Sequence, residues 1–199
     1  MIPTPVSLDG GGAKSFLGKV ADRRRLDLVL SAISKEMKLL DLGCGNGWLV
    51  RRLRREGFNV TGIDTNLPLE ETDWLSRRSA YKTGFPTNTF DAVICLETIE
   101  HLDSRAYAEI RRISKNGCKL LVTTPKKKWN WLIELLSSAG LSEPLVTPHI
   151  NVVDSKDIPF ELEKSGSLML FEWYGIYIVS KGECNQRSTV HTNPVPSTV

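Results

Sequence analysis

The sequence predicts an α/β domain in which a mainly parallel sheet carries helices on both faces. Short apolar runs of strand length alternate with helical segments along most of the chain, an order typical of parallel strands joined by helical crossovers. A glycine-rich turn joins the first of these strands to a helix, and an acidic residue ends the second strand. With 199 residues, 41% of them hydrophobic, the chain can bury the core of one such domain but not of a second.

The first half of the chain is predicted to form one helix followed by a strand–helix–strand unit. The leading helix places Leu26, Val29, Leu30 and Ile33 on one face, which is typical of an amphipathic helix that packs on a core. The second helix is expected to end at Gly57. The predicted elements are a helix at 20–34, a strand at 38–42, a turn at 43–47, a helix at 48–56 and a strand at 58–63.

The second half continues the alternation and is predicted to close with an antiparallel pair. Its strongest strand, 90–96, is apolar except for Asp91, a composition typical of a strand that is buried on both faces of a sheet. We expect Gly117 to end the helix that follows and Pro125 to close the next strand. The predicted elements are a polar helical stretch at 69–78, a weak strand at 79–81, a strand at 90–96, a helix at 104–113, a strand at 118–123 and antiparallel strands at 167–171 and 175–180.

Both ends of the chain and one insertion fall outside this regular pattern. Residues 1–15 hold prolines and three consecutive glycines, which predicts a flexible arm. The tail 183–199 is polar and is expected to be disordered. The domain then covers 16–182, with a lid-like insertion at about 126–148 after the fifth strand.

Composition favours a cytoplasmic protein with a weakly basic surface. No apolar stretch reaches the roughly 20 residues that cross a bilayer, and the N-terminus lacks the layout of a signal peptide. The four cysteines form no C-x-x-C pair, so we interpret them as reduced thiols. The formal charge of +3 is too small to indicate a nucleic-acid partner, although basic residues cluster at 23–25, 51–55 and 126–128.

The turn at 43–47 and the acid that ends the second strand describe an adenosine pocket. Gly43, Gly45 and Gly47 let the backbone turn sharply and let a ligand touch it. Asp64 follows at the end of the next strand, where a carboxylate can accept both hydroxyl protons of a ribose. The spacing G-x-G-x-G departs from the dinucleotide fingerprint G-x-G-x-x-G, and no phosphate loop is completed, which favours a ligand without phosphates.

With this loop the sequence resembles the class I S-adenosylmethionine-dependent methyltransferases, whose glycine loop reads D-x-G-C-G-x-G. The resemblance runs from about residue 23 to 181 and includes the segments 85–91 and 97–101. It implies a Rossmann-like sheet of seven strands and S-adenosylmethionine as the cofactor. The glycine loop would line its methionine part, Asp64 would hold its ribose, and an arginine near Arg24 would meet its carboxylate. Near adenine, Ser79-Ala80 replaces an acid that many relatives carry. The implied cofactor-binding residues are Arg24, Asp41, Gly43, Cys44, Gly45, Asn46, Gly47, Asp64, Ala80 and Leu96.

The segment E-x-x-E-H contains the candidate catalytic residues Glu97, Glu100 and His101. If the chain turns helical there, offsets of three and four put all three side chains on one face. In one interpretation the carboxylates cap the helix or bind polar ligand atoms, and His101 hydrogen-bonds locally or acts as the general base. In the other, these three residues and His149 bind a divalent magnesium, manganese or zinc ion that activates an acceptor hydroxyl. Ubiquinone-biosynthesis O-methyltransferases and small-RNA 2′-O-methyltransferases resemble the chain at this segment.

The insertion and the resemblance together suggest a methyl acceptor. Lysines followed by tryptophans and an aliphatic face over 126–136 suit peripheral contact with a membrane, although a helix packed on its own domain has the same pattern. The leading hypothesis is O-methylation of a small-molecule hydroxyl on a quinone precursor, lipid or glycan. The alternatives are RNA 2′-O-methylation, which lacks the support of an RNA-binding module, and a non-catalytic partner protein that binds S-adenosylmethionine.

Overall fold

A computed structural model of the protein describes residues 16–68, 70–126, 155–169 and 172–181. The predicted arm 1–15, the tail 183–199, His149 and all but the first residue of the 126–148 insertion lie outside the described residues. The expectations for those segments, including the membrane contact through 126–136, therefore stay predictions.

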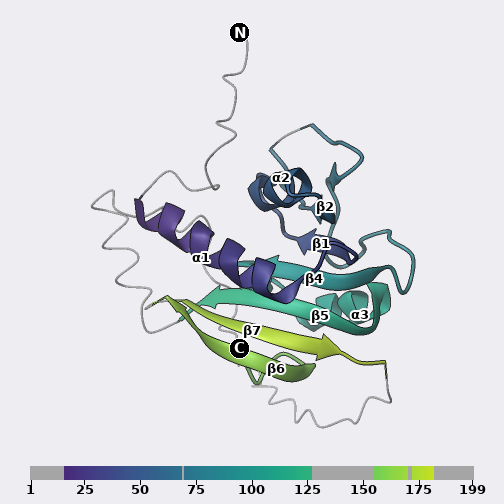
Figure 1. Cartoon of the computed structure of the whole chain (residues 1–199). Coiled ribbons are helices and arrows are strands. Elements are labelled where there is room, and N and C mark those ends of the chain that lie inside the picture. The colour runs from purple at the N-terminus through teal and green to yellow at the C-terminus, as the bar shows by residue number, and fades with distance from the viewer. Residues whose placement is uncertain (1–15, 69, 127–154, 170–171, 182–199) are drawn as a thin grey trace, which may run out of the picture.

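The core of the fold is a seven-stranded sheet in the order β3-β2-β1-β4-β5-β7-β6 (Figure 1). Strands β1 to β5 run parallel to one another, whereas β7 is antiparallel to both of its neighbours. This arrangement confirms the predicted mainly parallel sheet that closes with an antiparallel pair. The strands are β1 (Lys38–Leu42), β2 (Asn59–Ile63), β3 (Leu75–Ser76), β4 (Phe90–Leu96), β5 (Ser114–Pro125), β6 (Glu161–Met169) and β7 (Glu172–Val179).

Helices cover both faces of this sheet, as predicted. On one face α1 (Phe16–Ala32) and α2 (Trp48–Arg55) pack on a buried cluster that includes Leu39 of β1. On the other face α3 (Ser104–Ile113) packs on a second cluster, which includes the next residue, Leu40. Successive strand residues point to opposite faces, so a strand that is covered on both sides needs an unbroken apolar run.

The segment between β2 and β4 differs from the prediction. In the described part of 69–78 the chain forms turns and the two-residue β3 instead of a helix. The Thr72 hydroxyl accepts hydrogen bonds from the backbone N–H groups of Trp74 and Leu75, at 3.3 and 3.0 Å. Such local side-chain bonds compete with a helix for the same backbone groups. The strand expected at 79–81 is a turn.

α3 has the predicted bounds, but Gly117 does not end it. The helix ends at Ile113, whose carbonyl accepts a hydrogen bond from the Thr89 N–H at 2.7 Å. β5 begins directly at Ser114. Gly117 lies inside β5 with φ 78°, in the stretch where the register with β4 shifts, which is the position of a β-bulge.

None of the helices in the described residues is long and apolar enough to cross a bilayer. The cysteines of the described part, Cys44, Cys95 and Cys118, are buried free thiols. Burial is the main cause that raises the pKa of Cys118 to about 11, so this thiol stays protonated at neutral pH.

Candidate functional site

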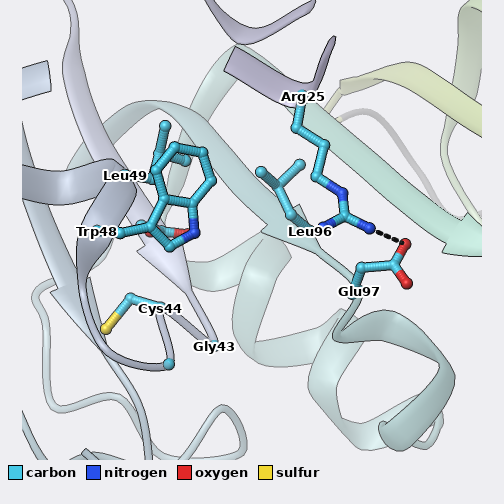
Figure 2. Close-up of a pocket in the computed structure, with 9 residues that line it drawn as sticks. Arg25, Gly43, Cys44, Trp48, Leu49, Leu96 and Glu97 are labelled. Carbon is cyan, nitrogen blue, oxygen red and sulfur yellow. Dashed lines mark ion pairs between the residues drawn. The ribbon is translucent and has the colours of Figure 1, made fainter. Parts of the chain in front are cut away.

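One edge of the sheet brings together the ends of the parallel strands and the first residue of β7. Because β7 runs antiparallel, its Glu172 pairs with Pro125 at the end of β5. A pocket of about 200 Å³ opens at this edge beside α1, α2 and the end of β4 (Figure 2). The residues that line it are Arg25, Asp41, Gly43, Cys44, Gly45, Trp48, Leu49, Leu96 and Glu97.

The glycine turn after β1 presents its backbone to this pocket. Gly43, Gly45 and Gly47 all have positive φ, at 80°, 54° and 72°, which glycine adopts without steric cost. The N–H groups of Gly43 and Cys44 donate to the carbonyl of Ile63 at 2.8 and 3.0 Å, and this ties the turn to the end of β2. Nothing lies within 4 Å of the place that a Cβ would take at Gly45. A ligand can therefore contact the bare backbone there.

Asn46 of the same turn organises the start of α2. Its Oδ1 accepts a hydrogen bond from the Trp48 N–H at 3.1 Å. The N-cap of this helix is a glycine without a side-chain cap, so Asn46 satisfies one of the backbone donors that a helix start leaves open. The side chains of Trp48 and Leu49 lie on the other side of the pocket from Arg25 (Figure 2).

Two aspartates stand close to the glycine turn. The Oδ2 atom of Asp64 accepts a hydrogen bond from the Gly45 N–H at 2.9 Å, and its Oδ1 atom accepts one from the Asn66 N–H at 2.7 Å. Each of these oxygens keeps a lone pair for a further donor. Asp41 is buried, and burial, followed by the charge of Asp64, raises the pKa of Asp41 to about 7.

The arginine at the pocket is Arg25, not Arg24. Arg24 is exposed on α1, whereas the guanidinium of Arg25 lines the pocket and binds Glu172 with two hydrogen bonds, at 2.9 and 3.2 Å. It also pairs with Glu97 at 3.5 Å and Asp22 at 3.4 Å. Burial alone would lower the pKa of Arg25, but the surrounding carboxylates outweigh burial and raise it.

Glu97 lines the pocket from the turn that follows β4. Its φ of 51° lies in the left-handed region, which costs a residue with a side chain about 1–3 kcal/mol and is concentrated at functional sites. Its Oε1 atom accepts a hydrogen bond from the Thr123 hydroxyl at 3.2 Å. Burial raises the pKa of Glu97 well above its usual range, Arg25 opposes this, and the nearby carboxylates of Glu172 and Glu100 add to it.

The segment E-x-x-E-H does not form the α-helix that was the condition for its three polar residues to share one face. The left-handed backbone at Glu97 precedes a single 3-10 turn, Ile99–His101. Glu100 is buried beneath this turn, and His101 is half-buried outside the lining of the pocket. Within the described parts of the chain, no group of three or more His, Cys, Asp or Glu side chains could hold a metal ion. The fourth ligand of the metal hypothesis, His149, lies outside the described residues.

Sequence reasoning missed Trp48, Leu49 and Glu172, while the expected contact of Ala80 with adenine stays a prediction. Ala80 packs against the core cluster on the α3 side and does not line the pocket. Trp48 and Leu49 begin the helix that follows the glycine turn, and this position in the sequence could have identified them as pocket residues. Glu172 fell between the two predicted antiparallel strands, although it is the one acid in an otherwise apolar and aromatic strand.

Glu100 makes the stability of the protein depend on pH. Burial, opposed by hydrogen bonds, raises its pKa from 4.5 to about 7, so the folded state favours the protonated carboxyl. Its stabilising contribution is complete below pH 4.5 and is lost as pH rises through 7, a change of about 3 kcal/mol. We expect Glu100→Gln to flatten the fall in the free energy of unfolding between pH 5 and 8, measured with urea. The exposed Glu161→Gln is the matched control, and an unchanged slope in Glu100→Gln would contradict this account.

Comparison with known proteins assigns the chain to a family. A family model described as a methyltransferase domain matches residues 15–167. A ubiquinone biosynthesis O-methyltransferase of Rickettsia canadensis is 26% identical over 131 residues, which cover 56% of each chain. An uncharacterized protein of Methanocaldococcus jannaschii is 36% identical over 98 residues, 47% of this chain and 43% of that protein. The chain thus spans about half the length of the curated relatives that it matches.

Solved structures show the same fold at low sequence identity. A protein of Pyrococcus horikoshii OT3 superposes with a TM-score of 0.63 at 20% identity, over 89% of this chain and 96% of that one. An S-adenosylmethionine-dependent methyltransferase of Methanosarcina mazei gives a TM-score of 0.55 at 18% identity, over 76% and 95%. The cyclase SpnF gives 0.56 at 20% identity, over 80% and 64%. These likenesses concern the fold alone.

Proposed function

Because the chain belongs to the methyltransferase domain family, we propose that it transfers a methyl group from S-adenosylmethionine to a small-molecule hydroxyl. The observation that carries the proposal is the pocket in which the glycine turn and Arg25 meet, with Asp64 bonded to the same turn. Among the acceptors expected from the sequence, a quinone precursor, a lipid or a glycan, the relatives named ubiquinone biosynthesis O-methyltransferases support the quinone precursor.

The residues of the pocket fit the amino-acid end of this cofactor. A volume of about 200 Å³ is below the roughly 300–1,000 Å³ of a pocket that encloses a whole ligand. In this proposal the pocket takes the methionine part, and the adenosine runs along the bare backbone of Gly45 toward Asp64. Arg25 is the one basic side chain among the described lining residues, so it is the partner for the methionine carboxylate.

Glu97 is the residue that we assign to the proton of the acceptor. When bound, the cofactor supplies an electrophilic methyl group on a sulfonium sulfur. The acceptor oxygen forms the new bond to the methyl carbon, the carbon–sulfur bond breaks with its electron pair going to sulfur, and the hydroxyl proton leaves. Glu97 lines the pocket, and its raised pKa makes it a stronger base than an ordinary carboxylate. His101, the base expected from the sequence, does not line it.

Methyl transfer needs its own test because a fold of this kind also occurs in the cyclase SpnF. The purified chain is incubated with methyl-labelled S-adenosylmethionine and separate panels of catechols, lipids, glycans and RNA. Label in a small-molecule hydroxyl is the expected result. Label in RNA alone would favour the 2′-O-methyltransferase alternative, and cofactor binding without transfer to any panel would favour a non-catalytic partner protein.

Asp64→Ala is expected to weaken cofactor binding without unfolding the protein. The change removes two carboxylate oxygens that, in the proposed complex, accept ribose hydroxyls, at a cost of about 1–3 kcal/mol. Titration calorimetry with S-adenosylhomocysteine measures the affinity. Asp73→Ala, an exposed acid after β2, is the matched control and should bind normally. Equal affinities for the two variants would remove Asp64 from the site.

A further inference from the structure

Glu172 is a buried carboxylate that the proposed reaction does not use. Only 1% of its surface is exposed, and it begins β7 opposite Pro125 of β5. An unpaired charge in this position would be strongly destabilising, so its partner is essential to the fold there. That partner is Arg25, which also lines the pocket.

The contacts of Arg25 with Glu172 and Glu97 differ in length and in burial, and this difference indicates which of the two a ligand can replace. Nε and Nη2 of Arg25 donate to the two carboxylate oxygens of Glu172 at 2.9 and 3.2 Å, the two-point geometry that holds a guanidinium most firmly. The contact with Glu97 is longer, 3.5 Å, and the Glu97 side chain is 28% exposed against 2% for Glu172. Glu172 therefore anchors the guanidinium through Nε and Nη2, whereas Glu97 reaches only Nη2 (Figure 2).

We propose that Glu172 is a positioning residue that fixes Arg25 so that the carboxylate of the cofactor replaces Glu97 as a partner of its guanidinium. The proposal rests on the proposed function, since it presumes S-adenosylmethionine as the ligand. A guanidinium has five N–H donors in a rigid plane. Nε and Nη2 donate to Glu172 and Nη1 donates to Asp22, whereas the contact of Nη2 with Glu97 can pass to another carboxylate without moving the side chain. The exchange also frees Glu97 to take a proton from the acceptor.

The test compares two ligands that differ in the amino-acid part. S-adenosylhomocysteine carries the carboxylate, whereas 5′-methylthioadenosine lacks the whole amino-acid group. Glu172→Gln should weaken the affinity for S-adenosylhomocysteine about tenfold, because a neutral amide loses one arm of the anchor. It should change the affinity for 5′-methylthioadenosine less than twofold. Glu163→Gln, exposed on β6, makes the same change in charge and should alter neither.

Glu172→Asp keeps the test decisive if Glu172→Gln is poorly folded, and a double variant tests the exchange of partners itself. Glu172→Asp keeps the charge but withdraws the carboxylate by one methylene, and should show a smaller loss with the same ligand selectivity. In Glu97→Gln/Glu172→Gln the competitor for Arg25 is gone as well, so part of the affinity for S-adenosylhomocysteine should return. An equal loss for both ligands, or no recovery in the double variant, overturns the positioning role. If the wild-type protein binds neither ligand, the proposed function itself fails.

Discussion

Replacing Arg25 with alanine is expected to cost about 3–5 kcal/mol of stability at pH 8, because it leaves buried carboxylates without their cation. Glu172 faces Arg25 with two hydrogen bonds, and Asp22 and Glu97 pair with the same guanidinium. Without the cation these three like charges repel one another in a site that excludes most water. Urea unfolding at pH 8 measures the loss.

The same variant should lose much less stability at pH 5. Without Arg25 the pKa of Glu97, already raised by burial, has no opposing charge, so the folded state binds protons more readily than the unfolded state. Stability is then present at low pH and is lost as pH rises. Arg24→Ala, an exposed arginine of the same helix, should change stability by less than about 0.5 kcal/mol. An equal loss for Arg25→Ala at pH 5 and pH 8 would show that packing, not charge, explains the effect.

The buried stripe of α1 explains why Arg25 rather than Arg24 lies at the pocket. In α1 the buried residues include Ala21, Leu28 and Ala32, and Arg25 falls on the same stripe, four residues after the first and three before the second. An arginine on the apolar stripe of a helix must find a buried acid. The partner Glu172 is 147 positions away, and no local pattern predicts which distant acid it meets.

Elements whose conformation depends on their own sequence were predicted better than segments whose conformation depends on contacts with other side chains. The bounds of β1, β4 and α3 were predicted correctly, because mainly apolar runs and helical periodicity are properties of the segment itself. The helix predicted at 69–78 was wrong because hydrogen bonds from the backbone to the Thr72 hydroxyl determine the conformation of this segment. The segment E-x-x-E-H does not form an α-helix with a shared polar face, because Glu97 adopts a left-handed backbone and contacts Arg25 and Thr123, which are tertiary contacts.

Two glycines of the turn should affect different properties when replaced by alanine: Gly43 mainly the stability of the protein and Gly45 mainly ligand binding. At Gly43 (φ 80°) an added Cβ would overlap the Thr98 side chain, so Gly43→Ala combines backbone strain with a steric clash and should cost roughly 2–5 kcal/mol of stability. At Gly45 (φ 54°) a Cβ meets nothing within 4 Å, so the strain alone remains, about 1–2 kcal/mol.

Although Gly43→Ala should lose more stability, Gly45→Ala should lose more affinity for the ligand when only folded protein is compared. The Cβ of Gly45→Ala would stand where the proposed ligand touches the backbone, so its affinity for S-adenosylhomocysteine should fall more than that of the folded fraction of Gly43→Ala. Thr98→Ala in the Gly43→Ala background removes the two closest atoms, Cγ2 and Oγ1, but keeps the Thr98 Cβ at 2.9 Å and the strain at φ 80°, and should restore part of the melting temperature. If Gly45→Ala binds like the wild type, the ligand does not lie along this face of the turn, and the adenosine path from the pocket to Asp64 is wrong.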